Sequence, residues 1–272
     1  MKNTWIITKF TLQEAFARKN FVTFFAVSSF AILIILAVFA STDLSNYTFV
    51  ANMAGPKFDL RQEVAKFFRV LVILPLFGGG LFLSIFSVSS FIPNMLEKGN
   101  IDVFLSKPIS RTELLLGKFF GGILVVFLNV LYLVLAIWVL TGTKFGSWDL
   151  SFLLSAFSIT FAFMVLYAMI ILIGVLTQSS VLAMMLSYII FFILSPLLEA
   201  RKSWGQIIHS DFVKSVIDML YYIIPKTSEM GTITKELAVG NQIQNFQPIF
   251  SSFLFMILTL VLSIFIFNKK DY

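Results

Sequence analysis

The 272-residue sequence has no cysteine, one histidine and few charged residues. Without cysteine it can form no disulfide, iron–sulfur cluster or thiolate zinc site and has no cysteine nucleophile. Because His209 is its one imidazole, we do not expect a histidine metal cage or a histidine-based catalytic triad. Charged residues make up 12% of the chain, whereas a water-soluble domain carries about 25%. A soluble globular protein is therefore excluded.

Apolar residues are abundant instead. They form 58% of the chain, with 33 phenylalanines, and the mean hydropathy is +0.94. A membrane-spanning helix needs about 20 consecutive apolar residues, and continuous apolar runs argue against barrel strands, which alternate. The sequence therefore predicts an all-α polytopic membrane protein. Six windows without an ionisable residue are the expected spans: Phe21–Ala40, Val70–Pro93, Phe119–Leu140, Phe152–Leu176, Val181–Leu198 and Ile249–Phe267.

The windows contain none of the charged groups on which ion-driven transporters depend. Proton relays and coupling sites use Asp, Glu, His or Arg within the bilayer, so a proton-coupled transporter or an intramembrane protease is not expected. The pair Gly117-Lys118 invites comparison with a phosphate-binding loop, but Thr112 stands where that motif needs Gly, and Phe119 where it needs Ser or Thr. We therefore expect no ATP hydrolysis and no cofactor in this chain.

The distribution of Lys and Arg indicates the orientation. The loops on the two sides carry equal numbers of Lys and Arg residues. On the side of the termini, these basic residues are spaced more densely and lie close to the spans, as at Arg18-Lys19 and Lys269-Lys270. Cytoplasmic loops are enriched in Lys and Arg, so both termini are expected in the cytoplasm. The net charge of +6 is assigned to this anchoring and not to nucleic-acid binding. The first window is longer than a signal-peptide core and is read as an uncleaved span.

Three segments outside the spans have distinct character. Residues 1–20 include a helix-compatible stretch, Trp5–Phe16, which suits an interfacial helix better than a frayed basic tail. Residues 199–248 form a long outer loop with two expected helices, from Ser210 to Pro225 and over Glu229–Val239. Because two such helices cannot build an independent core, they are expected on the membrane face.

Residues 94–118 form a charged cytoplasmic loop. Ser110 and Glu113 match a capping box, in which the two residues satisfy each other's backbone N–H groups at the start of a helix. We expect a short helix near Asn100–Ser106, an interruption at Pro108, and then a long helix entering the third span. The nearby Gly117 and Gly121 permit close helix contact, either inside the bundle, which is favoured, or at a dimer seam.

The residues of this loop also resemble a known family. The stretch Glu97–Gly121, with its Pro-Ile-Ser-Arg and Leu-Gly-Lys segments, is similar to the ABC-2 family of ABC transporter permeases, and most similar to those grouped with multicopper-enzyme maturation systems. The resemblance implies a type V exporter-like fold. It comprises an interfacial helix at 1–20 and a six-span domain over 21–272, with a coupling loop at 94–118 and an outer loop at 199–248.

The resemblance further implies a permease subunit, with another such subunit as a homodimer or heterodimer partner, in a bacterial or archaeal plasma membrane. Two separate ATPase subunits would bind ATP and Mg²⁺ on the cytoplasmic side. The family's coupling helix falls on about Gly99–Ser106. The residues expected to contact the ATPase are Glu97, Gly99, Asn100, Asp102, Phe104, Leu105, Arg111 and Glu113.

Two other functions remain as alternatives. A membrane scaffold or assembly factor would use the 199–248 loop to bind an extracytoplasmic partner and would transport nothing. A membrane enzyme acting on lipids would use interfacial groups such as Glu97, Arg111 or His209. Alanine substitutions in the 94–113 segment separate the first function from these, because only a permease should lose ATPase association.

Overall fold

The computed structural model describes residues 2–17, 19–41, 60–97, 99–101, 109–204 and 210–270, and every regular element within these ranges is a helix. Six helical segments of this part of the chain are long and apolar enough to cross a bilayer. The prediction of an all-α, multi-pass membrane protein is therefore confirmed. The segments are Val22–Ser41, Arg61–Leu96, Arg111–Phe145, Ser151–Thr177, Ser180–Glu199 and Gln247–Lys269.

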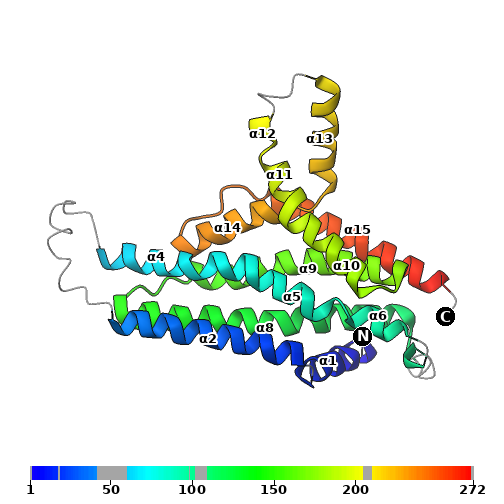
Figure 1. The fold of residues 1–272 in the computed structure, drawn as a ribbon, viewed down its shortest axis with the longest axis horizontal. Helices are drawn as coiled ribbons and strands as arrows, with labels where there is room; N and C mark the ends of the chain where they lie inside the picture. The colour runs from blue at the N-terminus through cyan, green and yellow to red at the C-terminus, as the bar shows by residue number, and fades with distance from the viewer. Residues whose placement is uncertain are drawn as a thin grey trace.

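The helices divide these spans more finely, as labelled in Figure 1. Two spans contain a π-helical segment, denoted η, in which the hydrogen bonds run one residue further than in an α-helix. The elements are α1 (Lys2–Ala17), α2 (Lys19–Ser41), α4 (Leu60–Pro75), η2 (Leu76–Gly80), α5 (Leu81–Val88), α6 (Phe91–Leu96), α8 (Arg111–Phe145), α9 (Ser151–Thr177), α10 (Ser180–Ile189), η3 (Ile190–Leu194), α11 (Ser195–Glu199), α12 (Arg201–Trp204), α13 (Asp211–Ile223), α14 (Thr227–Val239) and α15 (Gln247–Lys269).

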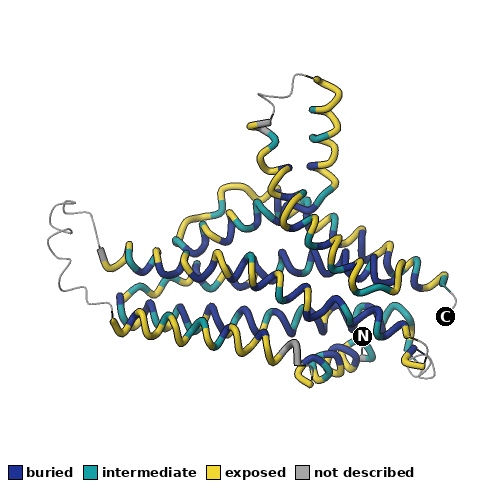
Figure 2. Tube along the Cα trace, viewed as in Figure 1, coloured by how far each residue is buried: buried dark blue, intermediate teal, exposed yellow. Residues whose placement is uncertain are grey.

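The core of the bundle surrounds α9. Its apolar window is 78% buried, because α8, α10, α14 and α15 all pack against it. The window of α2 is only 17% buried, and Figure 2 shows its exposed surface along the edge of the bundle. The first turn of α1 and the last turn of α15 lie at the same end of the bundle (Figure 1), as an even number of spans requires.

The helix boundaries follow the local sequence signals. The capping box between Ser110 and Glu113 is present at the start of α8, as predicted. Two helices end at glycines in the left-handed region, α8 at Gly146 with φ +73° and α14 at Gly240 with φ +89°. Only glycine adopts this conformation without strain, which explains why both helices stop there.

The outer loop differs in part from the prediction. Both of its expected helices form, as α13 and α14. However, α14 does not lie on the membrane face; it packs into the bundle against α9 and α4. The reason is a buried face that includes Met230, Ile233 and Leu237, an apolar stripe complementary to its two neighbours. By contrast, α13 stands away from the bundle with α12, next to α11 at the end of the fifth span (Figure 1).

The N-terminal helix α1 packs along the first turns of α8. A Cβ atom added at Gly117 would lie 2.6 Å from Cβ of Ile7, and one at Gly121 would lie 2.5 Å from Cβ of Thr11. The two glycines therefore admit α1, and the prediction that they serve packing within the bundle is confirmed. The opposite side of α1, including Trp5, is exposed, so its placement in the membrane interface remains a prediction.

Candidate functional site

The amino end of α8 joins three parts of the chain. The hydroxyl of Ser110 accepts from the backbone N–H of Glu113 (3.2 Å), and the Glu113 carboxylate accepts from the backbone N–H of Ser110 (3.2 Å). The same carboxylate accepts from Nδ2 of Asn3 in α1 (3.2 Å). Glu113 thus caps α8 and holds α1 against it, and the ATPase contact that the family resemblance implies for this residue stays a prediction.

Arg111 connects α8 to the end of the last span. One guanidinium nitrogen donates to the carbonyl oxygens of Phe267 (3.0 Å) and Lys270 (2.5 Å). The guanidinium carbon also lies 5.8 Å from the centre of the Phe267 ring. Since the last carbonyls of a helix lack partners within it, Arg111 caps α15. Lys270 in turn donates to the carbonyl of Val175 (3.0 Å), near the end of α9.

The predicted coupling residues fall into two groups. Glu97, Gly99 and Asn100 are exposed just beyond α6, where the chain turns through Gly99 with φ +90°. The backbone N–H of Asn100 donates to the carbonyl of Glu97 (3.1 Å), so a helical turn begins there. Most of the predicted coupling helix, including Asp102, Phe104 and Leu105, lies outside the described residues, as does His209. Arg111 and Glu113 belong instead to the helix contacts described above.

A buried ion pair reinforces the contact between α1 and α8. Nζ of Lys118 lies 2.6 Å from the Glu14 carboxylate, and the Lys118 side chain is 2% exposed. Its ammonium also lies 5.6 Å from the ring centre of Phe10 and 5.9 Å from that of Phe91. A buried cation is tolerated only where it is paired. The pair therefore fixes the position of α1 along α8.

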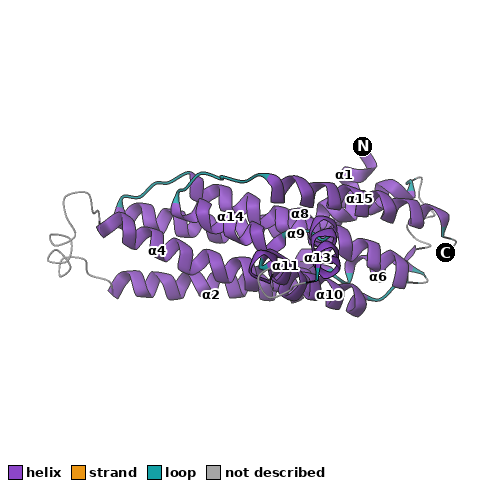
Figure 3. Ribbon diagram, turned by 90° about the horizontal axis from the view of Figure 1, so that it is seen from above, coloured by secondary structure: helices purple, strands orange, loops and turns teal. Residues whose placement is uncertain are grey.

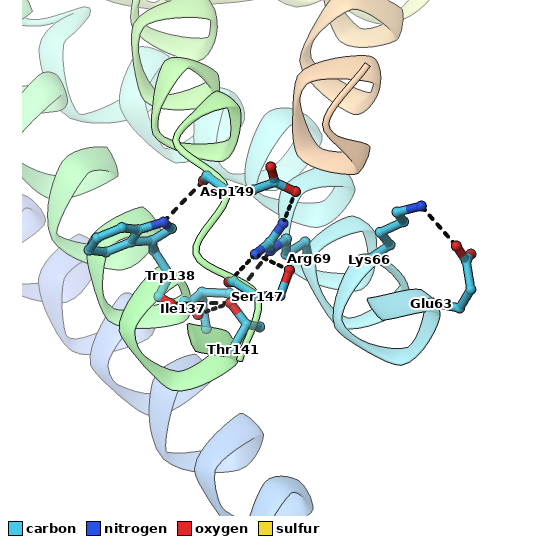
Figure 4. Close-up of polar contacts among 8 residues, drawn as sticks. All are labelled: Glu63, Lys66, Arg69, Ile137, Trp138, Thr141, Ser147 and Asp149. Atoms are coloured by element: carbon cyan, nitrogen blue, oxygen red, sulfur yellow. Dashed lines mark hydrogen bonds and ion pairs between the residues drawn. The ribbon is translucent and has the colours of Figure 1, made fainter. Parts of the chain in front are cut away.

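A second polar cluster (Figure 4) lies where α4 meets the turn between α8 and α9, at the end of the bundle away from the start of α8 (Figure 1). The Arg69 side chain of α4 is completely buried and lies 3.0 Å from the carboxylate of Asp149. It also donates to the carbonyl of Ser147 (2.5 Å) and to the hydroxyl of Thr141 (3.4 Å). Trp138 donates to the carbonyl of Asp149 (3.0 Å). These contacts clamp α4 onto the turn between α8 and α9.

The sequence analysis did not identify the buried cations of the two clusters. Arg69 and Lys118 each directly precede an uncharged window, Val70–Pro93 and Phe119–Leu140, so a search for charges inside the windows passes over both. The signal was an isolated cation at the edge of an apolar run, which needs either water or a partner. Asn3 carried no comparable signal, because single polar residues near chain ends are common, and the pair Lys269-Lys270 was interpreted only as a signal for orientation.

The described part of the chain gathers no group of three or more His, Asp or Glu side chains suited to a metal ion. The chemistry present at the α8 end is hydrogen bonding and ion pairing between helices. Such contacts can transmit force and fix the position of one helix against another. The arrangement therefore favours a mechanical role for this end of the bundle.

Comparison with known proteins agrees with these features. A family model described as ABC-2 family transporter protein matches residues 45–272, most of the chain. The search of curated proteins found no match to this chain. The family match is general, so the likeness to the multicopper-maturation group remains a prediction.

Proposed function

Because the chain belongs to the ABC-2 transporter family and is a permease component of an ABC transporter, we propose that it exports its substrate with energy from a separate ATPase subunit. The ATPase would bind ATP and Mg²⁺, since this sequence has no Walker motif. The observation that carries the proposal is the junction at the start of α8. It joins α1, α15 and the cytoplasmic loop through Glu113 and Arg111.

The ATPase would dock on the segment that follows α6. Glu97, Gly99 and Asn100 support this assignment because they are exposed, and because the chain enters this segment from one span and leaves it through the capped start of another. Asp102, Phe104 and Leu105 complete the proposed docking residues. Arg111 and Glu113 are positioning residues in this scheme, since their side chains are engaged with α15 and α1.

Force on the docking segment would move α8 together with α1. Gly117 and Gly121 bring the two helices into contact, and the pair of Lys118 with Glu14 prevents sliding. At about 52 Å for 35 residues, α8 is longer than the hydrocarbon core is thick. Movement of its cytoplasmic end would therefore reach the Arg69 cluster at the other end. Small shifts of packed helices are an established way to change access through a protein.

We place the translocation path along η2 and η3. The rings of Phe77 in η2 and Phe191 in η3 lie 5.9 Å apart. Next to them, Tyr188 stacks on Phe82 (4.6 Å) and donates to its carbonyl (2.9 Å). Short π-helical segments within α-helices are frequently found at functional sites, and here side chains of two of them meet. The apolar lining suits a hydrophobic substrate.

The complex would contain two permease chains, identical or different, and two ATPases in a bacterial or archaeal plasma membrane, with both chain termini in the cytoplasm. The end of α6, the first turn of α1 and the last turn of α15 lie at the same end of the bundle (Figure 1), which supports this orientation. So does the higher density of Lys and Arg on that side.

The test is affinity purification of the full chain from its native host in mild detergent, followed by mass spectrometry and an ATPase assay. We expect a stoichiometric Walker-motif protein with vanadate-sensitive hydrolysis. Glu97→Lys should strongly reduce its recovery. Glu63→Lys is the matched control, because Glu63 is an exposed carboxylate at the opposite end of the bundle. Absence of an ATPase from the wild-type eluate would overturn the proposal and favour the scaffold alternative.

A further inference from the structure

A groove runs between α2 and the second span, which comprises α4, η2 and α5. Its volume is about 480 Å³, within the range of small-molecule binding sites. Figure 3 shows α2 along one edge of the bundle, with α4 next to it, and Leu133 of α8 forms part of the floor. Val27 and Ile34 of α2 line the groove and are 48% and 49% exposed. Because both walls are membrane spans, the groove is open to the bilayer.

The second span leaves room for this groove at η2. Pro75, which has no N–H to donate, directly precedes η2, and Gly79 and Gly80 lie within it. Apart from the backbone of its own helix, no atom lies within 4 Å of a Cβ atom added at Gly79. The groove therefore reaches the backbone of the second span. Phe82, which also lines it, stacks on Tyr188, so the groove borders the path proposed along η2 and η3.

One polar pair interrupts the apolar lining. Ser28 is the one polar side chain among the described residues that line the groove, and its hydroxyl donates to Oδ1 of Asn129 in α8 (2.8 Å). The two residues are 3% and 1% exposed, and Asn129 is the one side-chain amide in the six apolar windows. Its Nδ2 has no acceptor in the part of the chain that the structure describes. Polar groups at such positions are costly, and in membrane spans they mark functional sites.

The directions of these hydrogen bonds define the ligand that fits. Ser28 gives its hydrogen to Asn129, so its oxygen offers only lone pairs to a ligand, whereas Nδ2 of Asn129 offers hydrogens. A hydroxyl group both donates and accepts, while an ether or ester oxygen only accepts and an alkyl chain does neither. A single hydroxyl on a ligand can therefore donate to Ser28 and accept from Asn129.

We propose that the groove binds an amphiphile from the bilayer, an apolar chain with one hydroxyl group, and that this hydroxyl is held by Ser28 and Asn129. The apolar walls hold the chain, and the backbone of Gly79 gives it space. The identification of this ligand as the exported substrate rests on the proposed function. Binding itself does not, because every residue of the groove belongs to this chain.

The test is photolabelling of the purified full-length chain in phosphatidylcholine vesicles. One probe is hexadecanol with a diazirine in the middle of the chain. The other is its methyl ether, which keeps the oxygen and loses the donor. Gly79→Leu fills the groove, and Gly78→Leu is the matched control: a Cβ atom added at either glycine has no neighbour within 4 Å, but Gly78 does not line the groove. Asn129→Leu removes the amide at similar volume.

We expect the alcohol to label the groove peptides, residues 24–35 and 71–83, several-fold more than the ether does in wild type and in Gly78→Leu. Gly79→Leu should lose the labelling, and Asn129→Leu the preference for the alcohol. Equal labelling by the two probes in wild type would overturn the proposal without any variant, and so would undiminished labelling in Gly79→Leu. A disulfide between two copies of Val27→Cys would also overturn it, because a second chain would then cover the groove.

A second measurement separates this inference from the proposed function. Hexadecanol should stimulate ATP hydrolysis by the co-purified complex of wild type and of Gly78→Leu, but not of Gly79→Leu. Specific labelling without this stimulation would overturn the role of the ligand as substrate. Absence of an ATPase from the eluate would overturn the proposed function alone, since photolabelling needs no ATPase.

Discussion

The guanidinium of Arg69 and the carboxylate of Asp149 form an ion pair of 3.0 Å in which only one partner is buried. The Arg69 side chain is 0% exposed and that of Asp149 is 44% exposed. An arginine cannot lose its charge in a protein, so the buried partner depends on the exposed one. This asymmetry makes the two positions unequal in their response to substitution.

We expect Asp149→Ala to destabilise the protein more than Arg69→Met does. The first change leaves a buried guanidinium without its counter-charge, at a cost of about 3 kcal/mol. The second removes the charge and leaves Asp149 in contact with water, at about 1–2 kcal/mol for the lost hydrogen bonds. Unfolding followed by tryptophan fluorescence in one detergent checks the order. A larger loss for Arg69→Met would show that Asp149 is not the required counter-charge.

The contact of α1 with α8 predicts that glycine-to-alanine substitutions differ in their effect according to position. Gly117→Ala and Gly121→Ala place a Cβ within 2.6 Å of atoms of Ile7 and Thr11. Such overpacking costs about 1–3 kcal/mol and should release α1, seen as faster proteolysis of the N-terminus. Gly78→Ala is the matched control, because no atom lies within 4 Å of its added Cβ. Equal protease sensitivity in all three variants would argue against the α1–α8 contact.

Substitutions at Arg111 and Glu97 should distinguish a loss of stability from a loss of ATPase docking. Arg111→Ala leaves the carbonyls of Phe267 and Lys270 without their donor, and we expect a loss of about 1.5–3 kcal/mol, as for hydrogen bonds to charged groups. Its recovery of ATPase per folded protein should stay near wild type. Glu97→Lys should show the reverse pattern. The measurements are the unfolding midpoint and the ATPase-to-permease ratio in the eluate; loss of ATPase from stable Arg111→Ala would return this residue to the docking surface.

The sequence predicted best where local physics decides the outcome. Uninterrupted apolar windows specify spans, and the Ser110–Glu113 pair specifies a helix start, because both depend on neighbouring residues alone. The packing of α14 into the bundle and the capping of α15 by Arg111 were not predicted. Each depends on a surface or a carbonyl group far away in the sequence. The family resemblance singled out Arg111 as an ATPase contact, which stays a prediction, whereas its contact with the end of α15 could be found only in three dimensions.

The base of the α13 arm predicts a pH dependence of stability. Lys226 is 3% exposed, and its Nζ finds no hydrogen-bond acceptor within the described ranges; it lies 4.0 Å from the ring centre of Tyr221. Burial lowers the pKa of Lys226 below its ordinary 10.5. Burial, followed by the Glu229 hydrogen bond, raises the pKa of Tyr221 to about 12.

The two residues act in different pH ranges with opposite signs. Between the folded pKa of Lys226 and 10.5 the unfolded chain binds more protons there, so stability rises with pH. Between about 10 and 12 the folded chain keeps the Tyr221 proton that the unfolded chain loses, so stability falls. Lys226→Met should abolish the rise and Tyr221→Phe the fall, both measured as unfolding midpoints against pH relative to wild type. Exposed lysines titrate alike in every variant, so these differences isolate the two groups. If the increase of stability with pH were unchanged in Lys226→Met, Lys226 would be as easily protonated in the folded chain as in the unfolded one.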